Sequence, residues 1–220
     1  MIGYYNYTVI ATYLSLASSV AGIFIAAAGK PYIAIFCLMF SGLLDAFDGR
    51  IARTKTDRDV HEQRFGVQID SLCDLVCFGV LPAVIGYFAC RPALDSVYFY
   101  IYIVCATVHV LGGVIRLSIY NIGEEDKRDR GITKEKPTYT GMPITTVVLI
   151  YPLVYLLRRP LSDNIEIFTV IWSVMLLVTG FLFVCKFHIR KPSLKGLILL
   201  IVFGAIIAAI VGVVYGVSKR

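Results

Sequence analysis

Seven apolar stretches, each close to the length needed to cross a lipid bilayer, take up most of this chain. A helix needs about 20 mostly apolar residues to cross a hydrocarbon core about 30 Å thick. Only 16% of the residues are charged, compared with ~25% in ordinary globular domains. We therefore expect residues 1–220 to form a single integral-membrane domain, an all-α polytopic helix bundle. The expected spans are residues 8–28, 31–48, 68–90, 97–120, 142–158, 164–185 and 196–217.

The first residues predict an aromatic belt at the head of the first span. MIGYYNYTVIATYLSL has no basic segment before its apolar run, and no small-residue cleavage site clearly ends that run. Tyrosines are enriched where a span meets the membrane surface. We expect no cleavable signal peptide here.

The basic residues predict which ends of the spans face the cytoplasm. Loops 49–67, 121–141 and 186–195 would lie on one side, and they contain fourteen of the 21 Lys and Arg residues. Cytoplasmic loops typically show this excess. We therefore expect a multi-pass cell-membrane protein with these loops in the cytoplasm, where its net charge of +6 favours anionic lipid headgroups. No basic and aromatic groove indicates a nucleic-acid partner.

Four aspartates stand at the predicted cytoplasmic ends of the second and third spans. Asp45 and Asp48 are spaced i, i+3, and Asp70 and Asp74 are spaced i, i+4, so each pair lies on one helix face. If the two faces meet, four carboxylates converge on one pocket. Two carboxylates about 4 Å apart repel by about 4 kcal/mol at an effective dielectric near 20. Such a cluster would be partly protonated or would hold cations.

The ligand type indicates which cations these would be. Carboxylates without nearby His or Cys favour Mg²⁺, Mn²⁺ or Ca²⁺ over zinc. Two such ions about 3.5–4 Å apart commonly stabilise displacement at phosphorus. The alternative is that the four aspartates only cap helices at the membrane surface.

Small residues and an arginine near the aspartates indicate a ligand that contains phosphate. Gly49, Ala52 and Gly66 would let a bulky nucleotide approach the helix backbone. Arg53 could form paired hydrogen bonds with phosphate oxygens. Gly66, Asp70 and Asp74 follow one another at intervals of four residues, so all three lie on one face of the third span.

Together these positions resemble the signature D-x-x-D-G-x-x-A-R…G-x-x-x-D-x-x-x-D of the CDP-alcohol phosphotransferase family. All eight defining residues are present: Asp45, Asp48, Gly49, Ala52, Arg53, Gly66, Asp70 and Asp74. One departure is visible, because twelve residues separate Arg53 from Gly66, several more than the family commonly has, and HEQRF looks like the added part.

This resemblance implies a fold, a cofactor and a role for each signature residue. It implies a six-helix core, homodimers and a polar cavity facing the cytoplasm, with the span at 196–217 as an extra C-terminal helix. Two divalent cations, Mg²⁺ or Mn²⁺, are implied. The implied ligands are Asp45, Asp48 and Asp70 for one ion, and Asp45, Asp70 and Asp74 for the other. The implied CDP-binding residues are Asp48, Gly49, Ala52, Arg53 and Gly66.

Three further stretches resemble the integral-membrane phosphatidylserine synthases: IDSLCDLVCFGVLPA (69–83), IRLSIYN (115–121) and YTGMPIT (139–145). They imply a CDP-diacylglycerol–serine O-phosphatidyltransferase. It would transfer a phosphatidyl or archaetidyl group from CDP-diacylglycerol or CDP-archaeol to the L-serine hydroxyl by direct displacement, releasing CMP. Asp74 is the candidate general base. The candidate serine-binding residues are Arg116, Asn121, Lys136, Tyr139 and Thr140.

Two other functions stay open at this point. A synthase for a phosphorylated acceptor, glycerol 3-phosphate or inositol phosphate, would want several basic residues at the cavity, and only Arg116, with Lys136 arguable, is placed near it. A divalent-cation transporter would need its aspartates near mid-bilayer, whereas these stand at one face. The phospholipase D-like serine synthases are disfavoured because no H-x-K motif occurs. His61, His109 and His188 are isolated and are expected to be structural.

Overall fold

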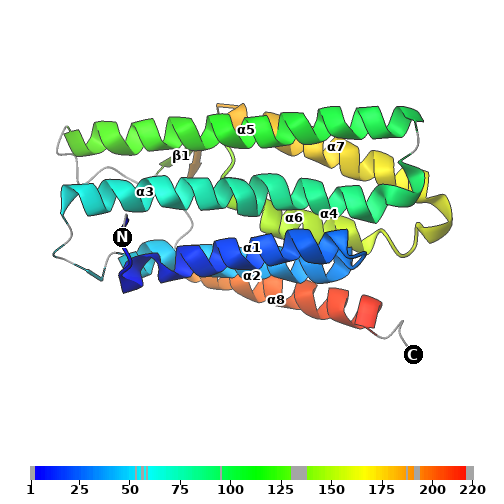
Figure 1. Ribbon diagram of the computed structural model, residues 1–220, viewed down its shortest axis with the longest axis horizontal. Coiled ribbons are helices and arrows are strands. Elements are labelled where there is room, and N and C mark those ends of the chain that lie inside the picture. The colour runs from blue at the N-terminus through cyan, green and yellow to red at the C-terminus, as the bar shows by residue number, and fades with distance from the viewer. Residues whose placement is uncertain are drawn as a thin grey trace.

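A computed structural model of the protein describes residues 3–52, 54–55, 57, 59–94, 96–129, 138–186, 188–190 and 194–216. Its long helices lie side by side along the long axis of the molecule, with α5 at one edge and α8 at the opposite edge (Figure 1). The helices are α1 (Ile10–Ala27), α2 (Pro31–Ala52), α3 (Val60–Asp74), α4 (Leu81–Cys90), α5 (Ser96–Asp129), α6 (Val147–Leu156), α7 (Ile165–Val184) and α8 (Leu194–Gly216). The predicted all-α polytopic bundle is confirmed.

Short elements connect these helices. A π-helical segment, η2 (Leu75–Val80), joins α3 to α4 without a break. Two three-residue strands pair antiparallel, with Tyr139 of β1 (Thr138–Thr140) opposite Ile189 of β2 (His188–Arg190). They join the segments that follow α5 and α7. The 3-10 turns are η1 (Tyr7–Val9), η3 (Arg91–Ala93), η4 (Ile144–Thr146) and η5 (Ser162–Asn164).

Five helical segments are long and apolar enough to cross a membrane: Tyr7–Ala27, Pro31–Ala52, Val60–Ala93, Val97–Asp126 and Ser162–Val184. Two shorter apolar helices, Ile144–Leu156 and Leu200–Tyr215, occupy the places of the fifth and seventh predicted spans. Pro152 lies inside the first of these two. The protein is therefore a multi-pass membrane protein.

Two predicted loops are partly helical, so the predicted span boundaries were wrong there. Both ends of the predicted loop 49–67 are helical, because α2 continues to Ala52 and α3 begins at Val60. The Asp59 carboxylate caps α3 by accepting a hydrogen bond from the Glu62 amide at 2.6 Å, which satisfies an amide at the helix start. α5 runs to Asp129, well past the predicted end at residue 120, because Glu, Lys and Arg favour helix outside the membrane as well.

Glycines allow the helices to approach closely. A Cβ atom built on Gly112 of α5 would lie 2.3 Å from the carbonyl oxygen of Gly180 on α7. A Cβ atom on Gly86 of α4 would lie 1.8 Å from Nε1 of Trp172 on α7. Small residues at helix crossings are typical of membrane proteins, where dispersion contacts hold the helices together.

Candidate active site

Three of the four predicted aspartates converge where α2 meets α3. One carboxylate oxygen each from Asp45, Asp70 and Asp74 lies within 4.8 Å of the other two. Asp70 Oδ1 is buried and has no hydrogen-bond partner in the part of the chain that the structure describes. Crowded carboxylates repel each other, and a buried oxygen without a partner is costly. This donor set fits a hard divalent cation such as Mg²⁺ or Mn²⁺.

Asp48, the fourth predicted aspartate, lies next to that group of three. Its side chain is buried and its Oδ2 accepts a hydrogen bond from the Thr12 hydroxyl on α1 at 3.2 Å. Sequence analysis missed Thr12, and nothing in the pattern could have revealed it, because the contact depends on how α1 packs against α2. The carboxylates of Asp45, Asp70 and Asp74 lie close together, and both predicted ligand sets stay predictions.

A buried polar network lies one turn beyond Asp74. The η2 π-helix follows Asp74 directly, and π-helical turns often lie at functional sites. His109 Nε2 lies 3.2 Å from the Phe78 carbonyl oxygen, and His109 Nδ1 lies 2.8 Å from Thr179 Oγ1. The carbonyl can only accept, so Nε2 holds the hydrogen. The structural role expected for His109 is therefore to link α5, α7 and the π-helical turn.

A cavity of about 810 Å³ opens beside the acidic cluster. Its walls come from α2, α6 and α8, with single residues from α3 and α5. Polar residues line one end and apolar residues the other. The polar end comprises Asp45, Asp48, Gly49, Arg50, Asp70, Tyr120, Thr145 and Thr146. The apolar lining residues are Phe36, Met39, Phe40, Leu43, Val148, Leu149, Leu200, Ile201, Gly204, Ala205 and Ala208.

Two of the predicted nucleotide-binding residues line the polar end of the cavity. Gly49 lines the cavity together with Asp48. Ala52 ends α2, and Gly66 lies on α3 one turn before Asp70. Arg53 lies outside the described residues. Arg50, which sequence analysis missed, also lines the cavity, and its place directly after Gly49 was the signal that could have found it.

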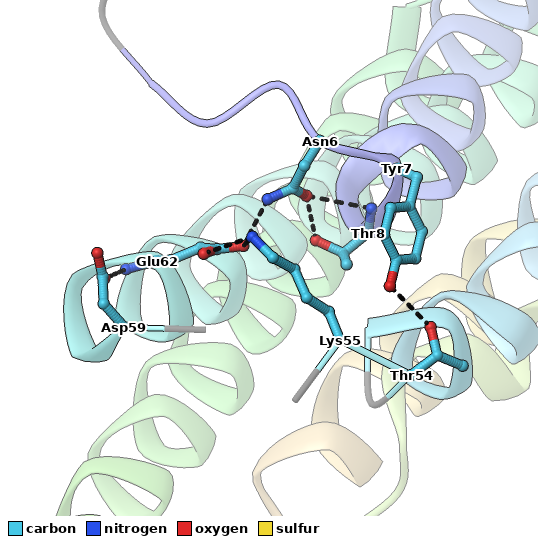
Figure 2. Close-up of polar contacts among 7 residues, drawn as sticks. All are labelled: Asn6, Tyr7, Thr8, Thr54, Lys55, Asp59 and Glu62. Atoms are coloured by element: carbon cyan, nitrogen blue, oxygen red, sulfur yellow. Dashed lines mark hydrogen bonds and ion pairs between the residues drawn. The ribbon is translucent and has the colours of Figure 1, made fainter. Parts of the chain in front are cut away.

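Polar contacts tie the segment between α2 and α3 to its surroundings (Figure 2). Lys55 Nζ lies 2.9 Å and 3.0 Å from the two carboxylate oxygens of Glu62 on α3. The Asn6 amide donates to the same carboxylate, which is buried. The Thr54 hydroxyl donates to the Ile51 carbonyl at 2.8 Å, so Tyr7 donates to Thr54 at 3.2 Å. We call the group of Asn6, Lys55 and Glu62 the clasp. Glu62 belongs to HEQRF, the stretch that looks added, and these residues form the first turns of α3.

The predicted serine-binding residues separate into two places. Arg116 is buried, and its Nε donates to the Met142 carbonyl oxygen at 3.2 Å, so it lies beside the segment that begins with Tyr139 and Thr140. Asn121 instead contacts α3, where its Oδ1 accepts from the Ser71 hydroxyl at 2.8 Å. Lys136 lies outside the described residues. These roles stay predictions.

Comparison with known proteins places this geometry in a family. The sequence profile of the CDP-alcohol phosphatidyltransferase family matches residues 5–184. The chain belongs to that family. The match covers the acidic cluster and ends at the last residue of α7. The matched residues contain α1 to α7, and α8 lies beyond the match.

Several relatives share this core. Archaetidylserine synthase of Methanothermobacter thermautotrophicus is 32% identical over 143 residues, which are 65% of this chain and 54% of the relative. CDP-diacylglycerol–serine O-phosphatidyltransferase of Helicobacter pylori is 29% identical over 176 residues, 79% of this chain and 66% of the relative. The enzyme of the same name from Saccharomyces cerevisiae is 29% identical over 62% of this chain and 48% of the relative. The chain thus spans about half to two thirds of these relatives.

Proposed function

We propose that this protein is a CDP-diacylglycerol–serine O-phosphatidyltransferase, a phosphatidylserine synthase that accepts a CDP-linked diacyl or archaeal lipid. The observation that carries the proposal is the meeting of Asp45, Asp70 and Asp74 beside a cavity that is acidic at one end and apolar at the other. A nucleotide-linked lipid has a polar nucleotide half that suits the acidic end and an apolar lipid half that suits the apolar end. We propose serine as the acceptor because these relatives are named for serine transfer.

The reaction would be a direct displacement at the β-phosphorus of the CDP-lipid. The serine hydroxyl oxygen forms a bond to that phosphorus while the bond to the CMP oxygen breaks. The hydroxyl proton passes to the Asp74 carboxylate, which acts as general base. A carboxylate is a weak base, so correct positioning and proton transfer concerted with attack provide much of the acceleration.

The other residues of the signature would bind and orient the donor. Asp45, Asp70 and Asp74, with Asp48 as a further ligand, would hold Mg²⁺ or Mn²⁺ ions, which would supply charge stabilisation for the departing CMP. Gly49, Ala52 and Gly66 would admit the cytidine nucleotide against the backbone, and Arg53 would bind its phosphates.

The serine pocket would lie near Arg116. Serine is a zwitterion, so its carboxylate requires a cation and its ammonium requires hydrogen-bond acceptors. The Arg116 guanidinium is buried beside the Tyr139–Thr140 segment, and guanidinium matches carboxylate geometry well. Asn121 and Lys136 complete the proposed set.

The proposed setting is the cell membrane, with the cavity mouth toward the cytoplasm. The loops next to the acidic cluster are the basic ones, as cytoplasmic loops are. We also propose that the protein forms homodimers, as its family resemblance implies. The cation-transporter alternative loses support because the chain belongs to a transferase family.

The decisive experiment measures CMP release by the purified protein with a CDP-lipid and Mn²⁺ or Mg²⁺. L-serine, glycerol 3-phosphate, inositol 1-phosphate and inositol are offered one at a time. We expect release with serine alone, and loss of release in Asp74→Asn. Release only with a phosphorylated acceptor would keep the metal site and reject the serine pocket, in which case Arg50 at the cavity would be the first phosphate-binding candidate.

Breaking the Lys55–Glu62 ion pair of the clasp is expected to weaken binding of the CDP-lipid donor. Replacing Glu62 with Gln removes the charge that pairs with Lys55 at 2.9 Å, loosening the segment next to Arg53. A buried charge-assisted bond contributes about 1.5 kcal/mol, so we expect the KM for the CDP-lipid to rise about tenfold. The kcat should stay near the wild-type value.

Steady-state kinetics at saturating serine test this expectation. Glu166→Gln, the same substitution at an exposed position on α7, is the matched control and should leave both constants unchanged. A fall in kcat with no change in the donor KM would show that Glu62 does not act through donor binding.

A further inference from the structure

The cavity continues along α2 beyond the acidic cluster. On α2 its lining runs from Phe36 to Arg50, and fourteen helical steps of 1.5 Å each correspond to about 21 Å. One leaflet accounts for about half of a hydrocarbon core ~30 Å thick. From Asp45 to Phe36 the cavity follows nine helical residues of α2, about 14 Å, which is close to the depth of one leaflet. Its deeper part is lined by apolar side chains such as Met39 and Leu149.

One wall of this deeper part is α8, which lies outside the residues that match the family profile. The far half of α8 is firmly packed. Ile207 and Val211 are buried, and the Tyr215 hydroxyl donates to the Tyr155 carbonyl at 2.9 Å. The Tyr215 ring also stacks on Tyr32, with centroids 6.2 Å apart. The helix is thus anchored at one end, and its near half borders the cavity.

The side of α8 that faces the cavity presents small residues to it. Gly204, Ala205 and Ala208 all line it. A Cβ atom built on Gly204 would lie 3.8 Å from Leu149 Cδ2 on α6, an ordinary contact, so a larger side chain there would extend into the cavity without forcing the backbone to move. From Leu200 to Ala208 the wall descends about 12 Å, so Ala208 lies deeper than Gly204.

We propose that α8 is the outer wall of a groove for a hydrocarbon chain of the donor lipid, and that Gly204 and Ala208 set how long and how bulky that chain can be. The occupant follows from continuity, because the apolar groove opens directly onto the carboxylates that would face the donor's pyrophosphate. This inference rests on the proposed function, since it takes the donor to be a CDP-linked lipid.

The test compares CDP-lipids with short straight chains and with long methyl-branched chains. Ala208→Leu fills the deep end, so kcat/KM for the long branched donor should fall by about tenfold or more, while the short donor is unaffected. Gly204→Leu fills the groove nearer the carboxylates and should lower kcat/KM for both donors. Ala209→Leu is the matched control, because Ala209 is exposed on the outward side of the same helix. Equal effects of Ala208→Leu on both donors, or none on either, would overturn the proposal.

A second readout does not depend on turnover. A CDP-lipid with a photoreactive diazirine near the end of its chain should crosslink to α8 in the wild type and in Ala209→Leu, and much less in Ala208→Leu. Crosslinks spread over the exposed face of α5 would instead contradict the proposal that the chain binds along α8. Crosslinking to α8 without CMP release would keep the groove and reject the transferase function, so the two failures are distinguishable.

Discussion

Asp70→Asn is expected to lower CMP release by at least about 1,000-fold, the equivalent of about 4 kcal/mol of transition-state stabilisation. The Asp70 carboxylate lies within 4.8 Å of Asp45 and Asp74, and its Oδ1 is buried without a hydrogen-bond partner among the described residues. Asn has nearly the same shape but no charge, so the substitution removes a ligand for a hard cation while preserving the packing.

Two measurements separate this cause from a folding defect. Mn²⁺ binding, followed by electron paramagnetic resonance, should weaken in Asp70→Asn, and the elution volume in detergent should stay that of the wild type. Asp126→Asn makes the same change at an exposed position on α5 outside the cluster and should bind Mn²⁺ normally. Unchanged Mn²⁺ binding in Asp70→Asn would show that Asp70 is not a metal ligand.

Gly112→Ala is expected to be the most damaging small substitution in the helix packing. Its new methyl group would lie 2.3 Å from the Gly180 carbonyl oxygen, and a backbone atom cannot rotate away, so α5 and α7 must separate. Overpacking of this kind costs about 3 kcal/mol. The same crossing brings His109 to Thr179, so the network beside η2 should loosen as well. Titration of mixed micelles with a denaturing detergent would measure the lost free energy of unfolding.

Gly123→Ala is the control on the same helix. A Cβ atom at Gly123 would have no atom within 4 Å among those placed by the structure. Because alanine favours helix over glycine by about 1 kcal/mol, this variant should be as stable as the wild type or slightly more so. Equal stability of Gly112→Ala and Gly123→Ala would contradict the close crossing of α5 and α7.

The features that sequence analysis predicted correctly are local ones. Apolar length located the spans because a bilayer imposes one thickness on each of them. The spacing of Asp70 and Asp74 placed both carboxylates on one face because helical geometry repeats every 3.6 residues. The boundaries near Val60 and Asp129 were wrong because apolarity marks only the part of a helix inside the membrane, and polar helix-forming residues continue beyond it.

Contacts between helices were beyond the reach of sequence analysis. Nothing in the pattern of α2 indicates that Asp48 faces Thr12 while Asp45 joins Asp70 and Asp74. The position of α8 as a cavity wall likewise depends on how its buried residues and Tyr215 pack against neighbours.

By itself, the sequence determined that this protein is a membrane helix bundle and that its acidic residues form two ordered pairs within the signature of its family. It could do so because hydrophobicity and helical spacing are properties of single segments. Only the tertiary structure decided which three carboxylates meet, where Arg116 and Asn121 lie, and that α8 closes a groove against α2 and α6. Those outcomes depend on how the surfaces of different helices fit together, and that fit emerges only once the helices pack against one another.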